Sequence, residues 1–161
     1  MYNKIMVPLD GSDLAECVMP HAEAVISGFK STEVVLVRVV NPLRLPVSVP
    51  AQSNMGFTEK DRQQLEENRK KAANDYLEKM AGSLNIPGTV FSYAVLEGNP
   101  ANMLAEYATK NAVDLIVIAS HGRSGVSRWV MGSVAERVIR TVCVPVMMVR
   151  APGCEPRAES G

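Results

Sequence analysis

Two glycines and a serine in the last third of the chain have the types and spacing expected of a site for phosphate groups. Gly122 and Gly132 stand ten positions apart, and Ser133 directly follows the second glycine. The apolar run 115–118 precedes them and predicts a buried strand, while residues 134–140 predict an amphipathic helix. A glycine-bearing loop between a strand and a helix start presents backbone N–H groups to anions. The spacing therefore predicts a loop that holds the phosphates and sugar of a nucleotide.

Each residue near this loop also has a simpler structural interpretation. The glycines alone could shape a turn and a helix start. Asp10, at the end of the first apolar run, is as suited to capping a helix as to touching a ligand. His121 has a side chain that titrates near neutrality, but no Ser–His–acid set accompanies it, which favours hydrogen bonding or packing. Arg123 could pair with phosphate, although a lone loop arginine is more often solvated.

The sequence offers no machinery for catalysis. The motif GxxxxGK[ST] does not occur, so no lysine of that motif reaches the β- and γ-phosphates of a nucleotide. No general base for attack by water stands out. No Cys–His cluster of the zinc-binding type surrounds either histidine. We therefore expect no catalytic residue and no metal ion held by the protein alone.

The composition limits which kinds of binding partner, and which cellular compartment, we expect for the protein. The 161 residues include 17 Lys plus Arg and 17 Asp plus Glu, so the formal net charge is zero. This balance disfavours broad electrostatic capture of nucleic acid. No apolar run is long enough to span a bilayer, and no long apolar segment of the signal-peptide type opens the sequence. The three cysteines form no CxxC pair, which predicts free thiols in a reducing cytoplasm.

Apolar strand patterns alternate with helix patterns along the chain. This alternation predicts a parallel α/β sheet in one domain over residues 1–150, followed by a disordered tail at 151–161. The connection 41–57 contains three prolines and predicts a lid, a binding loop or a mobile segment. The predicted strands are 4–9, 33–40, 89–96, 114–119 and 144–149, of which the third and the fifth are expected at the edges of the sheet.

The predicted helices begin at residues suited to capping. Ser12 is the expected cap of the first helix, Thr58 with Asp61 resembles a capping box, and Asn99 precedes Pro100 at a third helix start. The first helix is expected to kink at Pro20 and to end at Gly28. The apolar stripes expected to face the core are Leu14, Val18, Ala22, Val25 and Phe29 in the first helix and Leu65, Ala72, Tyr76, Met80 and Leu84 in the second.

Four segments together resemble the universal stress protein family. They are the opening Lys4-Ile5-Met6-Val7-Pro8-Leu9-Asp10-Gly11-Ser12, the Asn99-Pro100 helix start, the pattern Ser120-His121-Gly122-x9-Gly132-Ser133, and Val144-Pro145-Val146. The similarity runs from about Tyr2 to Arg150. Nucleotide-binding members of the family carry G-x2-G-x9-G-[S/T], and here Ala119 stands at the first glycine position. Alanine would hinder a positive φ or a very close approach of a ligand.

The resemblance implies an open parallel five-stranded sheet of order 3-2-1-4-5 with helices on both faces, the adenine nucleotide alpha hydrolase-like fold. It further implies three groups of nucleotide contacts. Pro8, Leu9, Asp10 and Val39 would line the adenine and ribose side. Ala119, His121, Gly122 and Arg123 would approach the ribose and phosphates. Gly132, Ser133, Val134 and Ala135 would present a helix N-terminus to the phosphates, and any Mg²⁺ would be bound through those phosphates.

Two functions of different classes follow from this resemblance. One is a stress-response module that binds ATP or a related adenine nucleotide, regulates a partner or its own dimer, and hydrolyses ATP slowly at most. The alternative is a nucleotide-free dimeric interaction module in which Ala119 marks lost affinity. The resemblance also implies a homodimer through antiparallel pairing of strand 144–149. An adenine-nucleotide hydrolase is disfavoured because Leu9-Asp10-Gly11-Ser12 stands where such enzymes carry SGGxDS.

Overall fold

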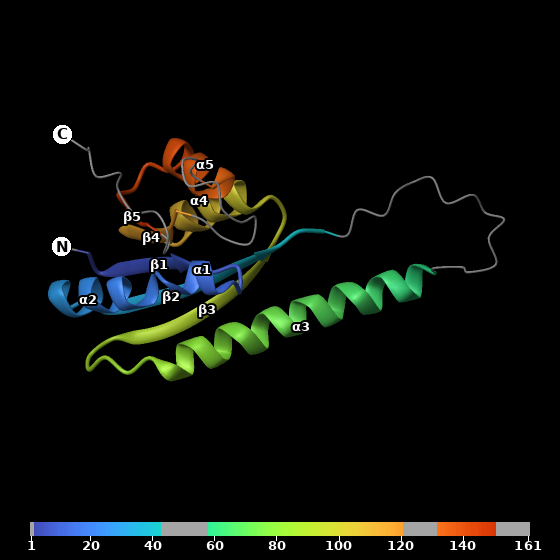
Figure 1. Ribbon diagram of the computed structural model, residues 1–161, viewed down its shortest axis with the longest axis horizontal. Coiled ribbons are helices and arrows are strands. Elements are labelled where there is room, and N and C mark those ends of the chain that lie inside the picture. Colours follow the sequence, from blue (N-terminus) through green and yellow to red (C-terminus); the bar gives the residue numbers. More distant parts are fainter. Residues whose placement is uncertain (1, 43–57, 121–131, 151–161) are drawn as a thin grey trace, which may run out of the picture.

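A five-stranded parallel sheet forms the centre of the molecule (Figure 1). The computed structural model describes residues 2–42, 58–120 and 132–150. The strand order is β3-β2-β1-β4-β5, with every neighbouring pair parallel, as the resemblance implied. The strands are β1 (Lys4–Pro8), β2 (Glu33–Val40), β3 (Val90–Glu97), β4 (Leu115–Ala119) and β5 (Val146–Val149). Their ends lie within two residues of those predicted, and β3 and β5 occupy the two edges.

Two apolar cores cover the two faces of the sheet. Alternate strand residues point to opposite faces, so β1 sends Ile5 and Val7 into one core and Met6 into the other. The first core is closed by α1 (Asp13–Glu16), α2 (Met19–Phe29) and α3 (Glu59–Ser83). The second is closed by α4 (Pro100–Lys110) and α5 (Ser133–Thr141). Burial on both faces explains why the central strands are continuous apolar runs.

The prediction of one helix kinked at Pro20 is wrong, because the structure has two separate helices, α1 and α2, in this segment. Ser12 caps α1, as predicted, by accepting from the backbone N–H of Ala15. The helix α1 ends after one turn. Pro20 lies in the first turn of α2, where its missing N–H costs no helical hydrogen bond. The left-handed residue that ends α2 is Lys30, with φ 53°, and not Gly28.

The long helix α3 begins as predicted but buries a different stripe. Thr58 and Asp61 form the capping box, with the Asp61 carboxylate accepting from the backbone N–H of Thr58 at 2.8 Å. Ala73 and Leu77 are buried, whereas Leu65 of the predicted stripe is 41% exposed. The N-terminal half of α3 extends past the ends of the strands (Figure 1). In the stripe predicted for the first helix, Val18 and Ala22 are buried as expected, but further along α2 Ile26 is buried instead and Phe29 is 42% exposed.

Of the remaining predictions, some concern described residues and can be compared with the structure, and others fall on residues outside the described ranges. Asn99 caps α4 through its side chain, which accepts from the backbone N–H of Asn102 at 3.3 Å. Cys17 is half-buried and Cys143 exposed, and both are free thiols. No helix within the described ranges has the length and apolarity that crossing a membrane requires. Residues 43–57 and the predicted tail 151–161 lie outside the described residues, and the division into a domain and a tail stays a prediction.

Candidate functional site

The sheet opens between its two central strands at their carboxyl ends. β1 pairs with β2 as far as Pro8, opposite Val37, but its register with β4 ends at Met6, opposite Ile116. Pro8 has no N–H with which to continue the ladder toward β4. β4 nevertheless runs on to Ala119. The strands therefore separate at the point where the strand order reverses direction, which is where ligands bind in open α/β sheets.

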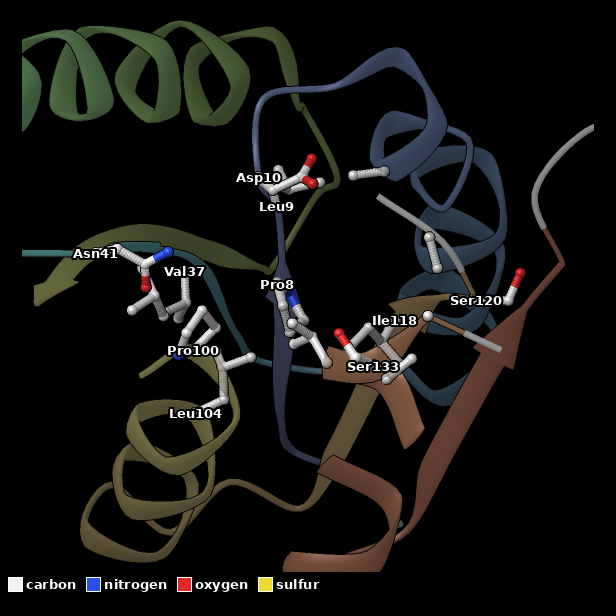
Figure 2. A pocket seen from close by; sticks show the side chains of 16 residues that line it. Pro8, Leu9, Asp10, Val37, Asn41, Pro100, Leu104, Ile118, Ser120 and Ser133 are labelled. Carbon is white, nitrogen blue, oxygen red and sulfur yellow. The ribbon is translucent and has the colours of Figure 1, made fainter. Parts of the chain in front are cut away.

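A cavity of about 330 Å³ occupies this opening (Figure 2). Nine of the twelve residues predicted for the site line it: Pro8, Leu9, Asp10, Val39, Ala119, Gly132, Ser133, Val134 and Ala135. The other three, His121, Gly122 and Arg123, lie outside the described residues. The structure therefore brings the described part of the predicted site together from two loops, three strands and a helix start. That these residues contact a nucleotide stays a prediction.

Seven further residues line the cavity that sequence reasoning did not find: Ala15, Val37, Asn41, Pro100, Leu104, Ile118 and Ser120. Val37 could have been inferred from Val39, since residues two apart in a strand share a face. The others come from α1 and α4 and from the ends of β2 and β4. Pro100 and Ser120 stand in segments that carry the family resemblance but were not expected to line the site, and no motif marks Ala15, Asn41, Leu104 or Ile118. Figure 2 shows Asn41 and Val37 on one side of Pro8, and Ser133 and Ser120 on the other.

The Asn41 side of the cavity includes an unpaired stretch of strand edge. The backbone N–H of Leu9 donates to the carbonyl of Val37 at 2.8 Å and is the last bond from the first strand segment to β2. Because strand residues two apart direct their N–H and C=O groups to the same side, those of Val39 face the space that the chain leaves after Leu9. No backbone bond from the segment after Leu9 to Val39 is found among the described residues. Val39 thus offers one donor and one acceptor beside the cavity.

The turn after β1 is fixed by the Asp10 side chain. Its Oδ1 atom accepts from the backbone N–H of Ser12 at 2.9 Å and from the Ser12 hydroxyl at 2.6 Å. The Ser12 oxygen in turn accepts from the backbone N–H of Ala15 at 3.2 Å. Asp10 therefore braces the cap of α1 and also lines the cavity. The structural and ligand-facing interpretations of Asp10 are compatible.

The Ser133 side of the cavity is the start of α5. Glu136 makes the first backbone bond of this helix, to the carbonyl of Gly132 at 3.0 Å. The N–H groups of Ser133, Val134 and Ala135 precede it and have no carbonyl partner within the helix. Gly132 differs, since its N–H donates to the carbonyl of Ser120 at 2.8 Å. Its amide is therefore not available to an anion, and its place in the site is to shape the wall.

Ala119 has ordinary strand geometry. It is buried, pairs with Val149 of β5, and is the last residue of β4. Among the described non-glycine residues, only Lys30 and Ala112 have positive φ. The backbone at position 119 therefore does not require glycine, and one of the two reasons to expect an effect of alanine there is removed.

The chemistry of the lining is that of a binding site. Asp10 is the only charged side chain among the described residues that line the cavity, and most of the rest are aliphatic. No group of three or more His, Cys, Asp or Glu residues suited to a metal ion occurs in the described ranges. The arrangement can enclose a flat apolar group, satisfy its polar edge at Val39, and receive an anion at the start of α5.

Comparison with known proteins gives one consistent relationship. The sequence model of the Universal stress protein family matches residues 1–150. Universal stress protein MJ0531 of Methanocaldococcus jannaschii is 34% identical over 152 residues, covering 94% of this chain and 84% of that protein. The solved structure of MJ0577, also a universal stress protein of that organism, has a TM-score of 0.80 at 27% identity, covering 95% of this chain and 99% of the other. A universal stress protein family protein of Arabidopsis thaliana, solved with AMP bound, has a TM-score of 0.64 at 14% identity, covering 98% and 97%.

Proposed function

Because the chain belongs to the universal stress protein family, we propose that its cavity binds ATP or a related adenine nucleotide in a stress response. The protein would act by binding, changing the state of a partner or of its own dimer, with at most slow hydrolysis of ATP. One observation carries the proposal. The cavity at the switch point of the sheet lies between Val39 and the start of α5, and among the described residues no backbone bond uses the inward-facing groups of Val39 or the N–H groups of residues 133–135.

The Val39 side suits the adenine base. The Watson–Crick edge of adenine offers an amino donor beside a ring-nitrogen acceptor, and Val39 offers a C=O and an N–H. Val37 and Leu104 supply apolar surface for the faces of the ring. Guanine carries an oxygen where adenine carries the amino group, so its edge would place an acceptor against the Val39 carbonyl. The site should therefore prefer adenine to guanine.

The α5 side suits the phosphates. The N–H groups of residues 133–135 and the Ser133 hydroxyl lie at the start of α5 and can donate to an anion. The helix dipole contributes a further ~0.3–1 kcal/mol of attraction for an anion there. Mg²⁺ would be held through the phosphate oxygens, since Asp10 is the one carboxylate among the described lining residues and it is bonded to Ser12. The AMP seen in the Arabidopsis thaliana relative supports an adenine nucleotide as the ligand class.

Slow hydrolysis at most is proposed because the described lining contains no histidine, lysine or glutamate to activate water or to stabilise a leaving phosphate. Localisation in a reducing cytoplasm remains our proposal, and the free thiols of Cys17 and Cys143 agree with it. Homodimerisation would use the outer edge of β5, where Met148 is 39% exposed.

Isothermal titration calorimetry of the purified protein with ATP, AMP and GTP tests the main proposal. We expect saturable binding of both adenine nucleotides and at least about tenfold weaker binding of GTP, the penalty for one opposed acceptor pair. Absence of heat with ATP and with AMP at millimolar concentration would refute nucleotide binding. Equal affinity for ATP and GTP would refute the assignment of the base to Val39.

A further inference from the structure

We infer that Arg38 is a positioning residue of the nucleotide site, holding the turn Leu9–Ser12 against the cavity from outside. The inference rests on the proposed nucleotide binding. Arg38 lies on β2 between Val37 and Val39, which both line the cavity. Because side chains alternate along a strand, Arg38 points to the opposite face, toward α3. It is absent from the cavity lining, so it would act through the turn rather than on the ligand.

The guanidinium group lies flat against Gly11. A Cβ atom placed on Gly11 would meet Arg38 Nη1 at 2.9 Å, Cζ at 3.0 Å and Nη2 at 3.1 Å. These nearly equal distances mean that the plane of the guanidinium faces the glycine broadside. Gly11 also has φ +81°, a conformation that side chains rarely adopt. Glycine at position 11 thus meets two needs, the left-handed turn and the close approach of Arg38.

The same guanidinium is held from α3 by an aromatic ring. Arg38 Cζ lies 5.0 Å from the centre of the Tyr76 ring, within the range of a cation–π contact. The Tyr76 hydroxyl donates to Glu16 Oε1 of α1 at 2.9 Å. Burial, and then the bond to Glu16, raise the pKa of Tyr76, so the hydroxyl stays protonated and remains a donor. Arg38, Tyr76 and Glu16 therefore connect three elements around the turn: β2, α3 and α1.

The turn held in this way carries two lining residues of the site. Leu9 and Asp10 precede Gly11 and border the cavity, and Asp10 also sets the cap of α1. If the turn spends only a fraction of its time in the binding-ready geometry, the apparent affinity for a ligand falls by that fraction. Arg38 would keep that fraction near one through its planar contact with Gly11.

The variant Arg38→Lys tests the inference because it keeps the charge and removes the plane. We expect AMP and ATP each to bind about fivefold more weakly, which corresponds to a fall from near one to about 0.2 in the fraction of protein whose turn is ready to bind. The two factors should be equal, since the turn lies away from the phosphate side of the cavity. The matched control is Arg62→Lys on α3, whose guanidinium bonds Glu59 and Glu66 away from the cavity, and whose nucleotide affinity should not change.

Hydrogen exchange supplies a readout at the turn itself. The backbone N–H of Ser12, bonded to Asp10 Oδ1, should exchange faster in Arg38→Lys than in the wild type, with no matching change in β4. Tyr76→Phe keeps the ring and loses only the bond to Glu16, so it should weaken binding less than Tyr76→Leu, which should weaken binding as Arg38→Lys does. Wild-type affinity in Arg38→Lys, or unchanged exchange at Ser12, would overturn the inference. A wild type that binds neither nucleotide would instead overturn the proposed function.

Discussion

Replacing Ser133 by proline removes one N–H group from the anion side of the cavity and leaves the helix intact. Ser133 is the first residue of α5, the position at which proline is best tolerated because its N–H has no partner within the helix. The preceding residue, Gly132, has φ −58° and ψ 137°, a conformation that a following proline favours. Ser133→Pro therefore isolates a backbone donor, which most substitutions cannot do. The control Ser133→Ala removes the hydroxyl alone.

The expected magnitude follows from the charge on the acceptor. A hydrogen bond to a charged group contributes about 1.5–3 kcal/mol, so loss of the Ser133 N–H should weaken AMP binding about tenfold or more beyond the loss seen in Ser133→Ala. The melting temperature should hold or rise slightly, since proline in a compatible conformation restricts the unfolded chain. Adenosine, which has no phosphate, should bind both variants equally well.

Calorimetric titration of both variants with AMP and adenosine, beside thermal melts, makes the comparison. If Ser133→Pro and Ser133→Ala bind AMP within twofold of each other, the start of α5 does not contact the phosphate and the placement of the anion is refuted. A tenfold loss for adenosine as well would mean that proline distorts the cavity, and the phosphate contact would again be without support.

Three other perturbations follow from the same contacts. Ala119→Gly should change ATP affinity by less than about threefold and destabilise the fold by about 0.5–1 kcal/mol, because position 119 is regular strand; a large gain in affinity would favour the nucleotide-free interpretation. The pKa of Asp114 is lowered by backbone hydrogen bonds from Lys4 and then Asn3, so its stabilisation is present at neutral pH and is lost as the pH falls through the lowered value. Asp114→Asn should therefore cost about 1 kcal/mol in urea unfolding at pH 7, and the difference from the wild type should shrink below about pH 4; a constant difference would exclude that linkage. Met148→Lys should convert a dimer to a monomer in multi-angle light scattering, because lysine on an edge strand opposes pairing, while AMP affinity stays unchanged; a persistent dimer would place the interface elsewhere.

The elements could be predicted from sequence wherever one local signal decided them. The run Val34–Val37 specifies a strand covered on both faces, and Thr58 with Asp61 fixes a helix start, because each depends on neighbours within a few residues. The buried stripe of α3 depended instead on how far the sheet extends beneath the helix. Leu65 fits the helical period and is nevertheless exposed, in the half of α3 that extends past the ends of the strands.

The candidate site divides in the same way. Its loop and helix-start residues, such as Asp10 and Ser133, could be found because turn and cap chemistry is written in short motifs. Leu104 could not, since it reaches the cavity only through the packing of α4 against the sheet. The hydrogen bond from the Gly132 N–H to the Ser120 carbonyl could not be predicted either, because it joins residues twelve positions apart in the chain.

Pro8, which has no N–H to donate at the end of β1, determines how a ligand enters the cavity. Because Pro8 cannot donate, β1 and β4 form no hydrogen bonds to each other at this end, and none has to be broken when a ligand enters. The opening is settled when the chain folds, before any ligand is present. Entry into such a preformed recess should be limited by diffusion and orientation rather than by a rearrangement of the sheet.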